Sequence, residues 1–342
     1  MSETRRPVKP KIDMKVDMSV WRGRIDKEEE TPALRWHQVV VPFDELAWAG
    51  SRVLLGFCCD EGVKRNKGQP GASDGPGAIR SMLANLAYDG DKPVFDAGDV
   101  FCIGENLEQA QANLARSVTK ILDRKMNLTV LGGGHEIAWG SFQGIMHHLQ
   151  GNQVESPDIG IVNLDAHFDL RNPVGNTGSV ARGSSGTPFR QIAEWCQEHN
   201  VKFNYHVIGL NPSANTSALF EYAKAKNVSW VEDIDVQPMN FELMVQELRS
   251  FIGRLDYLYL TLCLDVFASS IAPGVSAPAS VGISSEVVVS LIRSVKSICQ
   301  EFEVPIILTD IAEMNPHCDI DQRTARLAAR LVWEMCREPA VN

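Results

Sequence analysis

The sequence lacks any hydrophobic run long enough to cross a membrane, and its first 30 residues contain no apolar segment of the kind found in signal peptides. It also lacks an excess of basic residues. The formal net charge is −10, which argues against non-specific binding to nucleic acid. The eight cysteines include no CxxC pair, which argues against a zinc ribbon and favours a reducing compartment. We therefore expect a soluble cytoplasmic protein that binds neither nucleic acid nor a membrane.

Apolar strands alternate with amphipathic helices from about residue 52 onward. Near-continuous runs of Val, Ile and Leu are typical of strands covered on both faces, and hence of a parallel sheet. The expected strands are 52–58, 127–132, 158–165, 204–210, 228–232, 255–266 and 304–311. The expected helices are 75–88, 106–124, 187–199, 240–252, 284–302 and 321–335. The alternation predicts a three-layer α/β/α fold, with a weakly ordered tail over residues 1–30 and a single domain over 31–342.

Ionisable side chains follow four of the expected strands. In an open parallel sheet, ligands bind at the carboxyl ends of the strands, so these side chains mark the expected cleft. They are His135, Asp165, His167, Asp169, Asp265, Asp310 and Glu313.

Three of these residues occupy alternate positions of the segment "NLDAHFDLR": Asp165, His167 and Asp169. In an extended chain alternate side chains point the same way, about 7 Å apart, so one strand end would present two carboxylates and an imidazole. This set suits manganese, iron or zinc better than calcium, and two divalent ions can share a hydroxide and activate it. The alternative is a solvated strand edge. The preceding "IGIVNL" is apolar on both faces, which favours the metal site.

The motifs "GGGHE", "NLDAHFDLR", "LCLDVFASSIAPGVSAP" and "DIAEMNP" resemble, in this order, the four motifs of the ureohydrolases, the family of arginase, agmatinase and formiminoglutamase. The resemblance extends from about residue 52 to the last expected helix. The segments "DAHFDLR", "SSGTPFRQ" and "APGVSAP" resemble formimidoylglutamases most closely. The resemblance implies an eight-stranded, mostly parallel sheet and a binuclear manganese centre.

Carried over motif by motif, the resemblance implies that His135, Asp165 and Asp169 hold one manganese ion. It implies that Asp165, His167 and Asp265 hold the other ion, with Asp165 bridging the two. A homo-oligomer is a further expectation, since related enzymes often form rings.

Cys263 is a departure from the family pattern, because the usual Asp-x-Asp motif here reads Cys263-Leu264-Asp265. A thiolate is a softer ligand than a carboxylate, and manganese prefers oxygen. Cys263 therefore either ligates and keeps two ions, or fails and leaves one site weak, or favours a softer metal such as iron or zinc. A buried strand residue that does not touch the metal is the remaining alternative.

Two residues resemble substrate-binding groups. Glu313 resembles the acid that pairs with a guanidinium or formimino cation, whose two parallel N–H groups fit a carboxylate. Its alternative role is to stabilise a helix dipole. Arg171 lies two residues after Asp169, on the same face if the chain stays extended, and can clamp a substrate carboxylate. Arginase-like motifs carry a neutral residue at that position.

Ser185 is a second departure, because arginase and agmatinase carry a proton-shuttling histidine at this position. Asp169 is then the candidate that moves the proton to the departing amine. The further candidate substrate contacts are Ser185, Gly186, Thr187 and Asn211. Asn211 is equally a candidate turn residue.

The resemblance implies manganese-dependent hydrolysis of N-formimino-L-glutamate to L-glutamate and formamide, a step of histidine degradation. A metal-bridging hydroxide would be the nucleophile. One alternative is a ureohydrolase that acts on a guanidino acid such as guanidinobutyrate. The other is a metal-poor homologue that acts as a binding protein, with Cys263 marking decay of the centre.

Overall fold

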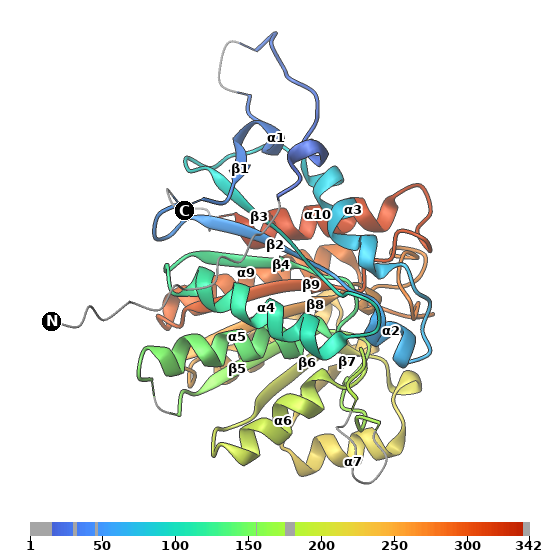
Figure 1. Cartoon of the computed structure of the whole chain (residues 1–342). Helices are drawn as coiled ribbons and strands as arrows, with labels where there is room; N and C mark the ends of the chain where they lie inside the picture. The colour runs from blue at the N-terminus through green and yellow to red at the C-terminus, as the bar shows by residue number, and fades with distance from the viewer. Residues whose placement is uncertain (1–15, 30–32, 45–46, 155, 175–181, 338–342) are drawn as a thin grey trace, which may run out of the picture.

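The computed structural model describes residues 16–29, 33–44, 47–154, 156–174 and 182–337 (Figure 1). In these ranges nine strands form one sheet in the order β1-β3-β2-β4-β9-β8-β5-β6-β7. Every neighbouring pair is parallel. The strands are β1 (Val40–Pro42), β2 (Arg52–Cys58), β3 (Val94–Phe101), β4 (Asn127–Leu131), β5 (Ile159–Leu164), β6 (Asn204–Leu210), β7 (Ser229–Glu232), β8 (Tyr257–Cys263) and β9 (Ile306–Ala312).

Helices cover both faces of the sheet, which confirms the three-layer α/β/α fold (Figure 1). One face carries α3 (Gly75–Leu83), α8 (Phe241–Ile252), α9 (Ser285–Glu301) and α10 (Arg323–Cys336). The other carries α4 (Leu107–Leu122), α5 (Ile137–Gly151), α6 (Pro188–Glu198) and α7 (Ser217–Ala225). Two short helices, α1 (Trp36–Val39) and α2 (Glu61–Arg65), lie in connections. Within the described ranges, no helix has the length and apolar character that a membrane span requires.

The sheet has nine strands rather than the eight that the resemblance implies, and the hydrophobic pattern does not predict β1 or β3. β1 has three residues, too few to produce a pattern. β3 is interrupted by Asp96 and Asp99, yet most of the strand is buried. Arg80 of α3 makes ion pairs with both aspartates at 2.9 and 2.6 Å, and Trp21 Nε1 donates a hydrogen bond to Asp96 Oδ2. These partners make burial of the two carboxylates possible, so a strand forms where the apolar pattern is broken.

The unpredicted helix α5 packs closely on α4 through glycines. A Cβ atom added at Gly144 would lie 2.5 Å from the Cβ of Val118, closer than side-chain atoms approach, so only glycine lets the two helices come this near. α5 is apolar on most of its surface, which hides the three- and four-residue periodicity of an amphipathic helix. Its first residue follows His135 by two positions, so this packing also places one of the expected metal ligands.

The first half of the expected N-terminal tail, residues 1–15, lies outside the described residues. Residues 16–29 begin with a 3-10 turn at Met18–Val20, and the Trp21 side chain that follows is buried. The boundary at residue 30 and the single domain over 31–342 stay predictions.

Four neighbouring strands in the middle of the sheet position the site. They are β4, β9, β8 and β5, and because all four are parallel their carboxyl ends lie at one edge. The ionisable residues identified above follow these same strands, with the exception of Asp310. Asp310 lies within β9, where its buried carboxylate accepts a hydrogen bond from the Tyr259 hydroxyl, so it does not reach the strand end.

Candidate metal centre

The carboxyl ends of the four central strands bring the expected metal ligands together. Each ligand lies at a strand end or in the turn directly after it, and most of these side chains are buried. The ligands after β4 and β5 are His135, Asp165, His167 and Asp169, and those from β8 are its last residue Cys263 and Asp265 in the 3-10 turn Leu264–Val266.

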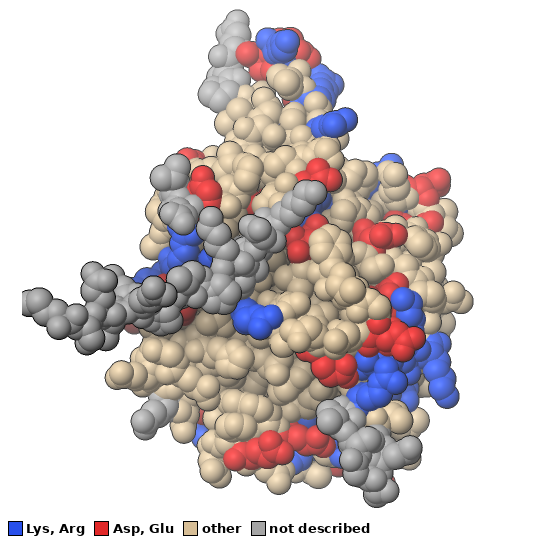
Figure 2. All heavy atoms as spheres, in the orientation of Figure 1, with Lys and Arg blue, Asp and Glu red and all other residues tan. Residues whose placement is uncertain are grey.

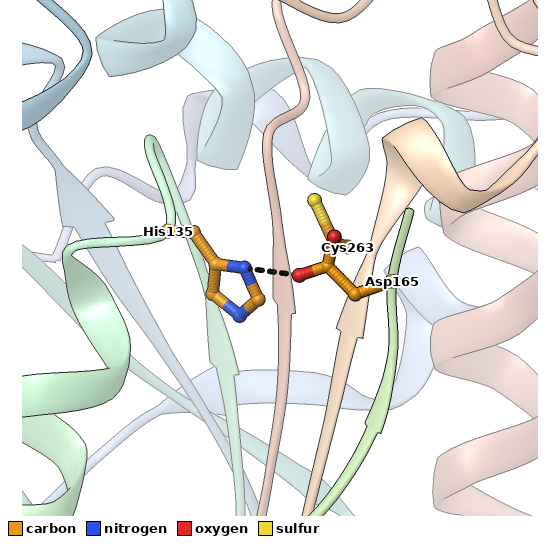
Figure 3. A group of neighbouring side chains, drawn as sticks. All are labelled: His135, Asp165 and Cys263. Carbon is orange, nitrogen blue, oxygen red and sulfur yellow. Dashed lines mark ion pairs between the residues drawn. The ribbon is translucent and has the colours of Figure 1, made fainter. Parts of the chain in front are cut away.

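One group of potential ligands consists of His135, Asp165 and Cys263, all buried, with ligand atoms within 4.8 Å of one another. Figure 3 shows these three side chains pointing toward one another from three different segments of the chain. His135 Nδ1 lies 2.9 Å from Asp165 Oδ2 and 3.1 Å from Asp169 Oδ2. The geometry therefore places Cys263 at the position that its motif register indicates, beside a histidine and two carboxylates.

A second group consists of Asp165, His167 and Asp265, again with ligand atoms within 4.8 Å of one another. His167 Nδ1 lies 3.2 Å from Asp265 Oδ2 and 3.6 Å from Asp165 Oδ1. Asp165 belongs to both groups. This is the arrangement that a carboxylate bridging two ions requires.

The strand geometry expected for the segment from Asp165 to Arg171 is wrong. β5 ends at Leu164, and Asp169 has a φ angle of 49°, in the left-handed region. The reason lies in the sequence: Asp165 Oδ1 accepts the backbone N–H of His167 at 2.7 Å, so the aspartate forms a turn onto its own chain. The three ligands therefore meet through a turn and not through alternation along a strand.

Polar residues inside the strands orient the ligands. Asn163 Nδ2 donates a hydrogen bond to Asp165 Oδ2 at 3.0 Å and another to the Tyr205 hydroxyl. The hydroxyl of Thr261 lies 3.0 Å from His135 Nε2. Such partners fix the orientation of metal ligands, and this leaves the other ring nitrogen of His135 facing the carboxylates. We did not predict these partners, although Asn163 and Thr261 stand out as polar positions in apolar strands.

The pKa values of the potential ligands in both groups indicate that the site contains more negative than positive charge. Burial, together with the Asp165 carboxylate, raises the pKa of Asp169 to about 6. Burial opposes the charged form of His135, but its contacts with Asp165 and Asp169 raise its pKa well above the usual value. Burial and neighbouring carboxylates also raise the pKa of the Cys263 thiol and of Asp265. Acids that resist ionisation and histidines that attract protons, all in one place, are expected where a cation belongs.

The orientation of individual atoms agrees with this conclusion. Among the described residues, His135 Nδ1 and Asp265 Oδ1 are buried and make no well-directed hydrogen bond. Leaving buried polar atoms unpaired costs about 1–3 kcal/mol each. Nitrogen and oxygen atoms converge in both groups, and the first group adds the sulfur of Cys263, which fits one or two divalent transition-metal ions.

A cavity of about 250 Å³ opens onto this group. The predicted site residues that line it are His167, Asp169, Arg171, Ser185, Cys263, Asp265 and Glu313. Glu313 follows β9 with a φ of 67°, and its Oε1 accepts the backbone N–H of His135 at 3.0 Å. Burial and the Asp265 carboxylate raise the pKa of Glu313 to about 8. A buried acid of this kind at a cavity wall is a candidate partner for a cationic ligand.

Three of the predicted substrate contacts have structural roles in this arrangement. The Thr187 hydroxyl accepts the backbone N–H of Ser184 and donates within the same turn, at the start of α6. The Asn211 side chain accepts hydrogen bonds from Ser213 N and Oγ, as its alternative role as a turn residue predicts. The backbone of Gly186 contacts that of Arg171, because the Gly186 carbonyl accepts a hydrogen bond from the Arg171 N–H at 2.9 Å.

Other residues that we did not predict also line the cavity, among them Asn66, Lys67 and Asn215. Asn215 Oδ1 accepts the Phe168 N–H at 3.0 Å, and its Nδ2 donates to the Ala166 carbonyl. Asn215 therefore holds the turn that carries His167. The only signal in the sequence is that each of the three lies in a polar stretch directly after a strand or short helix.

The sequence and the structure were compared with known proteins. The model of the arginase family matches residues 51–337. The formimidoylglutamase of Photobacterium profundum is 43% identical over 95% of this chain and 96% of its own length, and that of Aliivibrio fischeri is 46% identical over 94% and 95%. The structure of Trypanosoma cruzi formiminoglutamase with Mn²⁺ is similar with a TM-score of 0.73 and 25% identity, covering 89% of this chain and 97% of that one. This chain therefore belongs to the arginase family.

Proposed function

We propose that this protein hydrolyses N-formimino-L-glutamate to L-glutamate and formamide, consuming one water. The observation that carries the proposal is a single cavity that joins the metal-ligand group, the buried acid Glu313 and the cation Arg171. A substrate that carries an amidinium and a carboxylate needs a negative group to bind the first and a positive group to bind the second. The relatives named formimidoylglutamase, at 43% and 46% identity over nearly the whole chain, support the same activity.

We propose manganese as the metal, with two ions per chain. His135, Asp165, Asp169 and Cys263 would hold one ion, and Asp165, His167 and Asp265 would hold the other. The manganese in the Trypanosoma cruzi formiminoglutamase structure supports the choice of metal. When bound, the ions supply Lewis-acid chemistry, which lowers the pKa of water and stabilises negative charge that develops on the substrate.

Glu313 positions the amidinium of the substrate. Its carboxyl is buried, and the His135 N–H holds Oε1, so the group has a fixed orientation. Burial raises its pKa, and a bound cation lowers the pKa again because it favours the carboxylate. Binding of the amidinium therefore favours the deprotonated form of Glu313. The carboxylate then offers two acceptor oxygens to the amidinium N–H groups.

Asp169 moves the proton to the departing amine. Its Oδ2 faces His135 Nδ1, which leaves Oδ1 as the oxygen available to the substrate. Burial and the Asp165 carboxylate raise the pKa of Asp169, and a bound metal ion would lower it again, so the role of Asp169 rests on its place in the cavity wall beside the metal-ligand group. Ser185 lines the same cavity at the position of the histidine shuttle in arginase and agmatinase, and its hydroxyl cannot take over that role at neutral pH.

The proposal is tested by metal content and substrate range measured on one preparation. The full chain is purified under reducing conditions, reconstituted with manganese, and assayed with formiminoglutamate, arginine, agmatine and guanidinobutyrate. We expect about two ions per chain and turnover of formiminoglutamate alone. Turnover of guanidinobutyrate instead would establish the guanidino-acid alternative. No bound metal and no turnover of any substrate would favour the binding-protein alternative.

Cys263 is expected to ligate metal as a thiolate. Burial raises the pKa of the free thiol well above its usual value, but a coordinated thiol loses its proton to the metal. The chain reconstituted with cobalt(II) should show a near-ultraviolet charge-transfer band that disappears in Cys263→Ser. The substitution should also weaken the more loosely held ion by about tenfold, or ~1.4 kcal/mol.

Cys299→Ser is the matched control, because Cys299 is a buried cysteine on α9, away from the central strand ends. It should keep both the cobalt band and the metal affinity. A cobalt spectrum that is the same in the unsubstituted chain and in Cys263→Ser would show that Cys263 is a neighbour of the metals and not a ligand.

A further inference from the structure

We propose that Lys67 acts with Arg171 to recognise two substrate carboxylates, and that this pair makes the site selective for a dicarboxylic amidine. The inference rests on the proposed function and deepens it, since it assigns a residue to the choice of substrate. Lys67 and Arg171 both line the cavity that contains the metal-ligand group and Glu313.

The backbone holds Lys67 in a defined position. α2 ends at Arg65, and the next residues form a turn closed by hydrogen bonds from Asn66 N to Gly62 O and from Lys67 N to Lys64 O, at 2.9 and 3.0 Å. Lys67 has a φ of 65°, in the left-handed region that ends many helices. Two turns far apart in the sequence, the one after α2 with Lys67 and the one after β5 with Arg171, thus meet at the same cavity.

Neither cation has a protein partner in the part of the chain that the structure describes. No hydrogen bond or ion pair of the Lys67 or Arg171 side chain is found among those residues. The neighbouring cations on α2 differ: Lys64 Nζ lies 2.7 Å from Asp60, and Arg65 pairs with Glu61 and Glu108. Lys67 and Arg171 therefore keep their charges available for a ligand, whereas the cations beside them hold the fold together.

Glycine at position 186 lets the Arg171 side chain reach the cavity. A Cβ atom added there would lie 2.9 Å from Arg171 Cδ and 3.0 Å from Asn66 Nδ2. The Arg171 stem and the Asn66 amide therefore lie against the bare backbone of Gly186, which connects the Arg171 segment to the turn that carries Lys67. Asn66 has a polar side chain in the same wall and can donate an additional hydrogen bond to an anion.

The charges of the cavity match those of one class of substrate. Formiminoglutamate carries one amidinium and two carboxylates, and the cavity offers Glu313 for the first and Arg171 and Lys67 for the others. A guanidino acid such as guanidinobutyrate has one carboxylate and would leave one cation unmatched. Since the chain has a net charge of −10, local cations are also needed to attract a substrate with two carboxylates.

The two cations also line a neighbouring cavity of about 410 Å³, so they lie between the cavity at the metal-ligand group and this second one. Figure 2 shows Lys and Arg side chains gathered beside acidic ones on the part of the surface that carries α2 in Figure 1. This position suits groups that meet the substrate as it enters and then hold the part that is distant from the metals.

The test compares substrates that differ by one carboxylate in the manganese-loaded full chain. Formiminoglutamate is assayed beside its two monocarboxylate analogues, 4-(formimidoylamino)butanoate and 2-(formimidoylamino)butanoate. Lys67→Met should raise KM for formiminoglutamate about 10- to 100-fold with kcat within about twofold, because a charge-assisted contact to a non-reacting group contributes equally before and during the reaction. For the analogue that lacks the carboxylate held by Lys67, the substitution should change kcat/KM by less than about threefold.

Two further variants complete the series. Lys67→Arg keeps the charge and should recover most of the lost affinity. Lys64→Met is the matched control, because Lys64 lies three residues earlier, pairs with Asp60, and does not line either of the two cavities. Lys64→Met should leave KM and kcat unchanged for all three substrates. An equal loss on all three substrates with Lys67→Met, or no loss on formiminoglutamate, would overturn the inference while the proposed function stands.

A binding measurement keeps the inference testable if formiminoglutamate is not a substrate. Calorimetric titration measures the affinity for glutarate, which has two carboxylates, and for butyrate, which has one. Stronger binding of glutarate that is lost in Lys67→Met would retain the dicarboxylate site and reject only the proposed reaction. Equal binding of the two acids, or binding unaffected by the substitution, would reject the dicarboxylate site as well.

Discussion

Replacement of Asp165 by asparagine is expected to remove most of the bound manganese and to lower kcat/KM for formiminoglutamate about 10³-fold or more. Asp165 is the residue shared by both groups of potential ligands in the described part of the chain. Asparagine has nearly the same shape, but it carries no charge and offers one acceptor oxygen instead of two. Metal content after dialysis, measured by plasma mass spectrometry, and steady-state kinetics on the same sample check the prediction.

The control for this experiment is Asp123→Asn, at the exposed end of α4, where the carboxylate contacts His148. This variant should bind metal and turn over substrate as the unsubstituted chain does. Thermal unfolding of both variants separates loss of ligation from loss of fold. A dialysed Asp165→Asn protein that still holds about two ions per chain would contradict the bridging role.

Glu313→Gln is expected to lower kcat/KM for formiminoglutamate at least about 30-fold, or ~2 kcal/mol, while the metal content stays unchanged. The glutamine side chain resembles the protonated acid, so it removes the negative charge that should pair with the amidinium. Most of the effect should appear in KM, since the contact forms when the substrate binds. Kinetics with formiminoglutamate and a parallel metal analysis measure both quantities.

Glu303 offers a control with the same backbone conformation, because its φ of 55° is also left-handed but its side chain is exposed. Glu303→Gln should have no effect on KM. If Glu313→Gln kept its full kcat/KM, the Glu313 carboxyl would have to act in its neutral form, and a group other than Glu313 would have to balance the amidinium charge.

The strand ends were predictable because the apolar runs are long and each stops at an ionisable residue. His135, Asp165, Cys263 and Glu313 all lie where the sequence pattern places them, at the carboxyl ends of β4, β5, β8 and β9. The order of the strands does not follow from the pattern. Their adjacency in the sheet, which turns separate motifs into one site, depends on packing between distant segments.

Local hydrogen bonds account for much of what the sequence did not reveal. The turn formed by Asp165 replaces the extended chain that alternation suggests, since a carboxylate can capture the N–H two residues on. β3 was hidden because its aspartates become acceptable in a strand only beside Arg80. Lys67 was missed for a related reason: a lysine in a polar turn has no pattern that separates a cavity wall from a solvent-exposed loop.

The close contact between α4 and α5 has a genetic consequence. Gln111 of α4 donates a hydrogen bond to the carbonyl of Glu136, the residue next to His135, and the glycine at position 144 allows α4 to lie near enough to do so. Alleles that place a larger residue at position 144 would force the helices apart and shift the segment that presents His135. We therefore expect inherited loss of activity to map to this helix pair as well as to the ligands, in proteins whose catalytic residues are all intact.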